Sequence, residues 1–306
     1  MLKYYHRKIK DKKLIKTKNF TKGSWIYVED PSKEEIDKLV EKHGLDRGHV
    51  KDALDPHEVP RLELEGDMMY IYTRLPKLRA ETQFTTPLLI VINHDFLATI
   101  SLREIPIFDK FIKEKSLFST TQKVKFFIQI FFQINAFFSN TINELSKDIY
   151  EVSTRLSRIS NKEIVKLVAY EQALNDYSNA LVRTGTILNS LLSGKMLKLY
   201  EEDRDMIEDL FLANEQLVML TKNSLQTAKN TRDAYSTIMT NNLNRVIKFF
   251  TSLTIIMTIP TIVASFYGMN VRLPFASGEW TFALIAISTL ILMAVLIWWF
   301  SKNDWL

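Results

Sequence analysis

The chain has 306 residues, of which 46% are hydrophobic and 25% are charged, and its 40 lysines and arginines outnumber 35 acidic residues to give a net charge of +5. This length and mixture exclude a disordered tail and allow more than one structural unit. The chain contains no cysteine, which excludes disulfide scaffolds, thiolate metal sites, iron–sulfur clusters and cysteine nucleophiles. The mean hydropathy of −0.05 averages a charged stretch, residues 1–248, and an apolar stretch, residues 249–306, whose charged residues are Arg272, Glu279, Lys302 and Asp304.

The first 22 residues are rich in lysine and have no apolar core of the signal-peptide kind, so we expect the bulk of the chain not to be exported. An edge strand kept soluble by its lysines is the favoured interpretation of this segment. Contact with anionic lipid or nucleic acid is the alternative, and we do not count nucleic acid among the expected partners.

Short β-rich runs follow at residues 25–28, 68–72, 87–92 and 96–102, which predict strands. Gly66-Asp67 and Asn93-His94-Asp95 stand where hairpin turns would fall. A helix is predicted to start at Pro31-Ser32 and to end at Gly44. We therefore expect a mixed α/β domain over residues 1–119.

Residues 120–248 contain no proline, and their two glycines are Gly185 and Gly194, while apolar residues recur at helical spacing. This pattern predicts long antiparallel helices. The phenylalanine-rich run 125–138 is interrupted by Gln129, Gln133 and Asn135. It is better interpreted as the core face of a helix than as a membrane span, since a span needs about 20 apolar residues.

Two uncharged segments, residues 249–267 and 280–300, are each long enough to cross a membrane once. The loop 268–279 joins them into a hairpin, and the tail 301–306 follows. Arg245, Lys248 and Lys302 flank the spans on one side, against Arg272 in the loop. The positive-inside rule then predicts a multi-pass protein of the cell membrane with the large domain and both termini in the cytoplasm.

Polar or small residues recur along one face of the first span and its approach, at intervals of seven, three, four, three, four and three: Asn244, Thr251, Thr254, Thr258, Thr261, Ser265 and Gly268. We call this set the polar stripe. Ile247 and Phe250 interrupt it with apolar side chains. On the stripe alone, packing between helices is the favoured interpretation. A conducting pathway is the alternative, and it requires several copies because two helices cannot enclose a pore.

The first span ends in Tyr267-Gly268-Met269-Asn270. Here the sequence resembles the CorA magnesium transporters, whose signature is Gly-Met-Asn at this place, before a short loop and a second span. Residues 53–55 and 60–63, Ala-Leu-Asp and Pro-Arg-Leu-Glu, resemble a further family stretch, and the resemblance covers nearly the whole chain. It implies a funnel-shaped homopentamer with an α/β N-terminal cytoplasmic domain, long α-helices, a stalk helix continuous with the first span, and that span lining the pore.

The residue types agree with the resemblance, because Mg²⁺ binds oxygen and gives up its waters reluctantly. Gly268, Met269 and Asn270 would form the mouth, where a ring of Asn270 carbonyl oxygens accepts hydrogen bonds from the waters of the hydrated ion. The hydroxyls of the stripe would keep the ion solvated, Ile247 and Phe250 would close the pore by dewetting, and Asn244 would form a second polar ring.

Six carboxylates at residues 201–209 stand near a turn between two long helices: Glu201, Glu202, Asp203, Asp205, Glu208 and Asp209. Such a cluster is usually a solvated helix start. The functional interpretation is that Asp205, Glu208 and Asp209 bind regulatory cytosolic Mg²⁺ between subunits and hold the closed state. The N-terminal domain offers no clear acidic counterpart, because Lys77 and Arg79 follow its strand.

We therefore expect a channel, driven by the membrane potential, that admits Mg²⁺, with Co²⁺ and Ni²⁺ as further candidates. Its partners would be further copies of itself, the lipid bilayer and divalent cations. No phosphate-binding G-x-x-x-x-G-K-[ST] loop and no H-E-x-x-H motif occurs, so we expect no nucleotide, no organic cofactor and no enzymatic activity. A zinc-transporting relative of the same architecture and a non-conducting membrane-anchored signalling scaffold are the alternatives.

Overall fold

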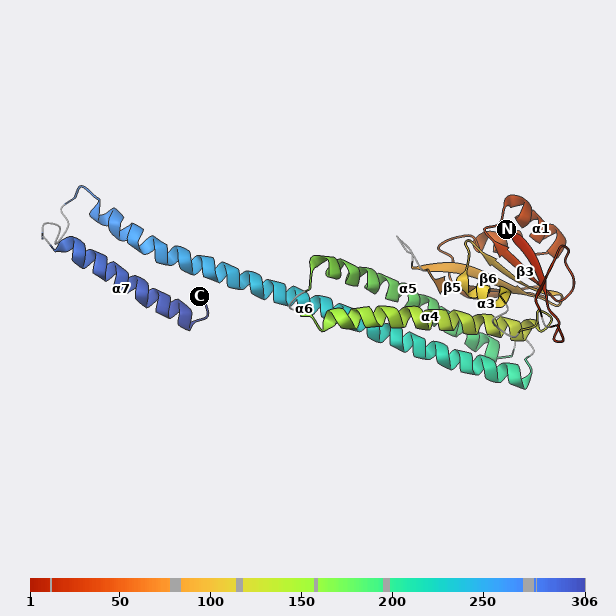
Figure 1. Ribbon diagram of the computed structural model, residues 1–306. Coiled ribbons are helices and arrows are strands. Elements are labelled where there is room, and N and C mark those ends of the chain that lie inside the picture. Colours follow the sequence, from red (N-terminus) through yellow and green to blue (C-terminus); the bar gives the residue numbers. More distant parts are fainter. Residues whose placement is uncertain are drawn as a thin grey trace. The chain divides into compact units, whose positions relative to one another are not determined.

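The computed structural model describes residues 1–11, 13–77, 84–113, 118–156, 159–194, 199–271, 278 and 280–305. Contacts divide the chain into two compact units, Met1–Arg232 and Asp233–Leu306. We describe each unit by itself, and Figure 1 gives the order of the elements along the chain.

The first unit is built on a seven-stranded sheet with the order β2-β1-β3-β7-β6-β5-β4. Neighbouring strands are antiparallel except for β3 and β7, which run parallel. The predicted strands correspond to β3, β5, β6 and β7, with residue 102 beyond the end of β7, and the two predicted hairpin turns join β4 to β5 and β6 to β7. The bounds are β1 Leu2–His6, β2 Ile15–Thr17, β3 Ser24–Glu29, β4 Arg61–Glu65, β5 Met68–Pro76, β6 Thr85–Ile92 and β7 Phe96–Ser101.

The lysine-rich N-terminus forms β1 and β2, and β2 is an edge of the sheet, as expected for a strand kept soluble by lysine. The predicted β-rich runs do not include β1, β2 or β4. Strand β2 pairs with its sequence neighbour β1, and β4 pairs with β5 across the Gly66-Asp67 turn. Strand β1 joins the sheet through β3, with Leu2 opposite Val28.

Helices α1 (Lys33–His43) and α2 (Arg47–Asp52) cover one face of the sheet. The predicted start of α1 is confirmed, since Ser32 and Glu35 form a capping box. Its predicted end is confirmed as well, because Gly44 takes the left-handed conformation with φ of 69°. Leu39, Val50 and Ala53 pack with the sheet residues of this face into one buried cluster.

The opposite face of the sheet packs against α4 (Lys123–Ser153) and α5 (Asn161–Leu192), with η1 (Pro106–Phe108) and α3 (Asp109–Ile112) preceding them. The phenylalanine-rich run lies in α4, where Phe126, Phe127 and Phe131 are fully buried. Its interpretation as a core face is therefore confirmed. Trp25 is also fully buried here, and its indole Nε1–H donates to Thr99 Oγ1 at 2.8 Å.

Consecutive long helices are antiparallel, as predicted. Asp148, near the end of α4, accepts from Lys166, near the start of α5. Phe138, earlier in α4, packs edge-on against Tyr177, later in α5, so the two helices run in opposite directions. Helix α6 (Glu201–Tyr267) follows as 67 continuous residues. It packs against α5, where its Asn214 side chain donates to the Leu181 carbonyl at 2.9 Å. The α/β N-terminal domain and the long helices are thus confirmed, and α6 includes both the predicted stalk and the predicted first span.

The second unit contains the remainder of α6 and helix α7 (Thr281–Lys302). Both α6 and α7 are long and apolar enough, by length and composition, to cross a membrane. Pro260 lies inside α6. Most large apolar side chains of this unit are exposed, including Phe266 at 59% and Phe282 at 84%.

Candidate functional site

All residues of the polar stripe lie on α6 or directly after it, and all are exposed. Ile247 and Phe250, which interrupt the stripe, are 53% and 59% exposed. No other segment of the described chain therefore covers this face of α6.

The opposite face of α6 is the one that the chain covers. Ser252 is fully buried and Ile256 is 5% exposed, and they continue a row that starts at Lys248, four residues earlier. The Lys248 ammonium lies 5.9 Å from the centroid of the Trp305 ring, so the segment after α7 contacts α6 on this row. At about 100° per residue, Ser252 lies roughly opposite Thr261 and Ile256 roughly opposite Ser265.

The stripe lies opposite the covered row, which helps to decide between packing of helices and a conducting pathway. If the hydroxyls joined the two helices of one hairpin, they would lie on the row of Lys248, Ser252 and Ile256. They lie on the other side, so packing within one chain does not account for them. What remains is contact between copies of the chain or an aqueous pathway.

The threonine hydroxyls bond back to their own helix. Thr254 donates to the Phe250 carbonyl at 2.8 Å, Thr258 to the Thr254 carbonyl at 2.7 Å, and Thr261 to the Met257 carbonyl at 3.2 Å. Such bonds satisfy the hydroxyl protons and leave oxygen lone pairs directed outward. The exposed row therefore presents hydrogen-bond acceptors, which suit the waters of a hydrated cation.

The helix ends at the predicted mouth. Helix α6 stops at Tyr267, and Gly268 N–H still donates to the Ala264 carbonyl at 2.9 Å. A Cβ at Gly268 would lie 3.2 Å from that carbonyl oxygen, so glycine permits the close last turn. Met269 shares a surface hollow of about 380 Å³ with two stripe residues, Thr261 and Ser265. Asn270 follows and is exposed.

The acidic cluster begins α6. Asp205, Glu208 and Asp209 are exposed, and among the described residues their carboxylates make no side-chain hydrogen bond or ion pair within the chain. Glu202 instead pairs with Lys125 of α4 at 2.8 Å. Asp203 is buried, and burial raises the pKa of its carboxyl group. Within the cluster, Glu202 is thus paired and Asp203 is buried, whereas Asp205, Glu208 and Asp209 are exposed.

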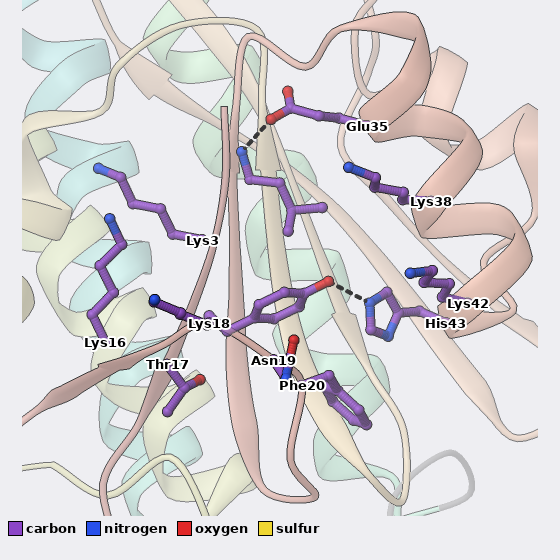
Figure 2. Close-up of a pocket in the computed structure, with 12 residues that line it drawn as sticks. Lys3, Lys16, Thr17, Lys18, Asn19, Phe20, Glu35, Lys38, Lys42 and His43 are labelled. Atoms are coloured by element: carbon purple, nitrogen blue, oxygen red, sulfur yellow. Dashed lines mark hydrogen bonds between the residues drawn. The ribbon is translucent and has the colours of Figure 1, made fainter.

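A lysine-lined pocket of about 920 Å³ lies between the N-terminal strands and α1. Figure 2 shows Lys38 and Lys42 of α1 across this pocket from Lys3, Lys16 and Lys18. Sequence analysis identified the basic N-terminus and missed the two α1 lysines, although their spacing of four residues puts them on one helical face. The acid of the pocket, Glu35, is engaged, since it accepts from the Leu2 N–H at 2.7 Å.

Some predicted features lie outside the described residues: Arg79, which follows the strand β5, Arg272 and Glu279 in the loop between the spans, and Leu306.

Comparison with known proteins decides the family. A family model described as "CorA-like Mg2+ transporter protein" matches residues 21–302. The chain belongs to the CorA family. Members of this family are ion transporters, not enzymes.

A curated relative, the cobalt/magnesium transport protein CorA of Methanocaldococcus jannaschii, is 26% identical over 290 residues, which cover 92% of this chain and 91% of the relative. The complete CorA structure from that organism matches with a TM-score of 0.85 at 22% identity, covering 100% of this chain and 99% of the other. The cytoplasmic domain of ZntB from Vibrio parahaemolyticus matches with a TM-score of 0.64 at 10% identity, covering 78% of this chain and 98% of the other. The CorA fold therefore extends over both units, including α6 and α7.

Proposed function

We propose that this chain is a channel that admits Mg²⁺ to the cytoplasm, with Co²⁺ and Ni²⁺ as further ions. The observation that carries the proposal is the uncovered polar stripe on α6, which ends at Gly268-Met269-Asn270 and lies opposite the face that the same chain covers. Membership in the CorA family supports the choice of a divalent cation.

Several copies, five by the family resemblance, would surround one axis with their stripes inward. One chain supplies only two candidate membrane helices in its described part, which cannot enclose a pore. In a closed ring each stripe faces water, while the apolar faces of α6 and α7 contact lipid or a neighbouring copy. In such an assembly the exposed polar surface contacts water, and the exposed apolar surface contacts lipid or protein.

The pore mouth selects among ions by contacting the water shell that an ion keeps. Mg²⁺ holds its waters tightly, so a ring of Asn270 side-chain oxygens accepts hydrogen bonds from those waters without removing them. Gly268 lets the backbone approach the ion, and Met269 lines the hollow beside it. Along the pore, the hydroxyl oxygens of Thr251, Thr254, Thr258, Thr261 and Ser265 continue the same contact with hydrated ions.

Ile247 and Phe250 form the gate and Asn244 a polar ring beneath it, since an apolar constriction closes to ions when it loses water. No nucleotide is needed for transport. Each charge gains about 2.3 kcal/mol per 100 mV, so a divalent cation entering an inside-negative cell gains about 4.6 kcal/mol. With Arg245, Lys248 and Lys302 flanking the spans, both termini lie in the cytoplasm.

Cytosolic Mg²⁺ regulates the closed state through Asp205, Glu208 and Asp209. Within one chain these carboxylates have no partner among the described residues, so bridging by Mg²⁺ to an adjacent copy is the arrangement that uses them. Low cytosolic Mg²⁺ then releases the bridge and favours the open state.

The test is Mg²⁺ entry into proteoliposomes that contain the purified full chain under an inside-negative potential. Asn270→Ala should abolish selective entry, whereas Asn242→Ala should leave it unchanged, because Asn242 is exposed on α6 but lies roughly opposite the stripe. Asp209→Asn should raise the internal Mg²⁺ concentration needed to suppress entry. Equal entry in Asn270→Ala and native protein would remove Asn270 from the mouth.

The same assay separates the alternatives. A scaffold gives no potential-driven entry by correctly assembled native protein. A zinc transporter gives Zn²⁺ entry that excess Mg²⁺ does not reduce. The oxygen-only chemistry of the stripe and of Asn270 favours Mg²⁺, because zinc sites in proteins usually include nitrogen or sulfur.

A further inference from the structure

A second cation-binding arrangement lies in the first unit, far along the sequence from the stripe. Asp46 caps the start of α2, His49 lies on α2, and Glu65 ends β4. One ligand atom from each of these side chains lies within 4.8 Å of the others. Among the described residues, this is the one group of three such side chains that converges in this way.

Register and helix placement create the convergence. In the β4–β5 pair, Glu63 is opposite Tyr70 and Glu65 is opposite Met68, so the two glutamates share a face with the tyrosine. Helix α2 packs on that face through Val50. His49 therefore reaches over Tyr70, with their ring centroids 4.0 Å apart and their planes 22° from parallel.

The imidazole is held in one orientation by Tyr72. The Tyr72 hydroxyl lies 3.1 Å from the His49 carbonyl oxygen, to which it donates, and 2.8 Å from His49 Nδ1. In the tautomer that carries Nδ1–H, this group donates to the hydroxyl oxygen and Nε2, on the other side of the ring, carries the lone pair. The His49 side chain is only 12% exposed, so its position is set by packing.

Nε2 faces carboxylates. The Glu65 carboxylate lies 3.3 Å from Nε2, and that of Glu63 lies 3.8 Å away. Glu63 already pairs with Arg61, so Glu65 is the acid available to Nε2. Asp46 Oδ1 accepts from the His49 backbone N–H at 3.0 Å, which holds this second carboxylate beside the imidazole. A dication between Nε2 and the carboxylates of Glu65 and Asp46 would accept the nitrogen lone pair and neutralise their charge.

The donor set distinguishes among metals. One imidazole nitrogen with two carboxylate oxygens suits Zn²⁺, Co²⁺ and Ni²⁺, whereas Mg²⁺ prefers oxygen alone. An Nδ1–H donation to Tyr72 would orient the ring, as the outer hydrogen bonds of metal-binding histidines to carboxylates, carbonyls or water do. An adjoining cavity of about 460 Å³, lined by Asp46, Glu65 and Asp67, gives water and ions access.

We propose that Asp46, His49 and Glu65 bind a first-row transition-metal dication, with water completing the coordination. The site goes beyond the proposed channel, because it uses no residue of the stripe, the mouth or the acidic cluster of α6.

The experiment is a Co²⁺ titration of the full chain in detergent, stripped of metal and kept in excess Mg²⁺ to fill oxygen-only sites. Calorimetry should give one Co²⁺ per chain, and X-ray absorption should detect one imidazole nitrogen in its coordination shell. His49→Gln and Glu65→Gln should abolish that binding, and Tyr72→Phe should weaken it about tenfold by releasing the ring. Asp67→Asn lines the same cavity and should bind as the native chain does.

Unchanged Co²⁺ affinity in His49→Gln, or a native spectrum without a nitrogen ligand, would overturn the proposal and leave a direct His49–Glu65 contact without metal. Circular dichroism of the metal-free variants checks that they fold, and the native spectrum needs no variant. Mg²⁺ entry that depends on Asn270 is a separate measurement, so failure of this site and failure of the channel are distinguishable.

Discussion

Phenylalanine and tryptophan side chains are shielded in the described part of the first unit and, apart from Phe300 and Trp305, exposed in that of the second. In Met1–Arg232, Phe126, Phe127 and Phe131 are fully buried, whereas in Asp233–Leu306 Trp280 is 76% and Phe282 is 84% exposed. The first unit closes its own apolar core, and the second leaves its apolar surface to something outside the chain. Exposed apolar area of this extent marks a lipid or protein contact. Only the first unit is complete as a single chain.

The largest expected effect tests this contrast directly with a matched pair of substitutions. Phe131→Ala should lower the free energy of unfolding by about 4 kcal/mol, because it leaves a cavity in a closed core. Phe266→Ala, at a side chain that is 59% exposed, should cost less than about 1 kcal/mol. Urea unfolding of the full chain in detergent measures both. Similar losses at the two positions would break the contrast and mean that assembled copies bury Phe266.

An intermediate loss in the free energy of unfolding is expected when Arg232, the last residue of the first unit, is replaced. Arg232 donates to Glu171 Oε2 at 2.6 Å, and the Glu171 side chain is 9% exposed. Arg232→Met keeps the apolar stem and removes the charge, which should cost about 3 kcal/mol by leaving a carboxylate poorly solvated. Glu171→Gln is the control and should cost less, since an amide is easier to bury than a carboxylate. An unchanged urea midpoint in Arg232→Met would show that α5 and α6 do not depend on this pair.

The smallest expected change is a loss of folding stability at acidic pH. Burial, with a further contribution from Lys42, lowers the pKa of His43, whose Nε2 contacts the Tyr4 hydroxyl at 2.9 Å. The unfolded chain therefore binds this proton more readily than the folded chain. The stabilising contribution is fully present above the ordinary histidine pKa of about 6.5 and is lost as the pH falls through the lowered folded value.

We expect the melting temperature of the native chain to decline more between neutral and mildly acidic pH than that of His43→Gln. Far-ultraviolet circular dichroism across this pH range measures both slopes. Parallel slopes would contradict the assignment and attribute the acid sensitivity to other groups.

Local patterns predict the elements whose stability is local. Ser32 and Gly44 mark α1 because a helix cap is a property of adjacent residues, and the phenylalanines of α4 mark a core face because their spacing matches one helix. Strands β1, β2 and β4 are not among the predicted β-rich runs. Strands β2 and β4 are held by local hairpins with β1 and β5. Strand β1 joins the sheet by pairing with β3, and no single run of residues contains that pairing.

The same distinction applies to the sites. The stripe lies on one helix, so its spacing alone predicts a common face. That this face is the uncovered one depends on Lys248, Ser252 and Ile256 and on the segment around Trp305, which only coordinates reveal. His49 and Glu65 come together through the β4–β5 register and the packing of α2, so sequence analysis of the histidines for H-E-x-x-H spacing could not find the cluster.

The placement of the five tryptophans also allows the intrinsic fluorescence of the protein to report on each unit. Trp25 is fully buried in the first unit with its indole hydrogen-bonded to Thr99, while Trp280, Trp298, Trp299 and Trp305 belong to the second. Brominated lipids quench indole emission at short range, so they would dim the second group and spare the first. Replacing Trp25 by phenylalanine would isolate the emission of the second unit, and the difference between the native and variant spectra would report the first unit, so that insertion and unfolding give separate signals.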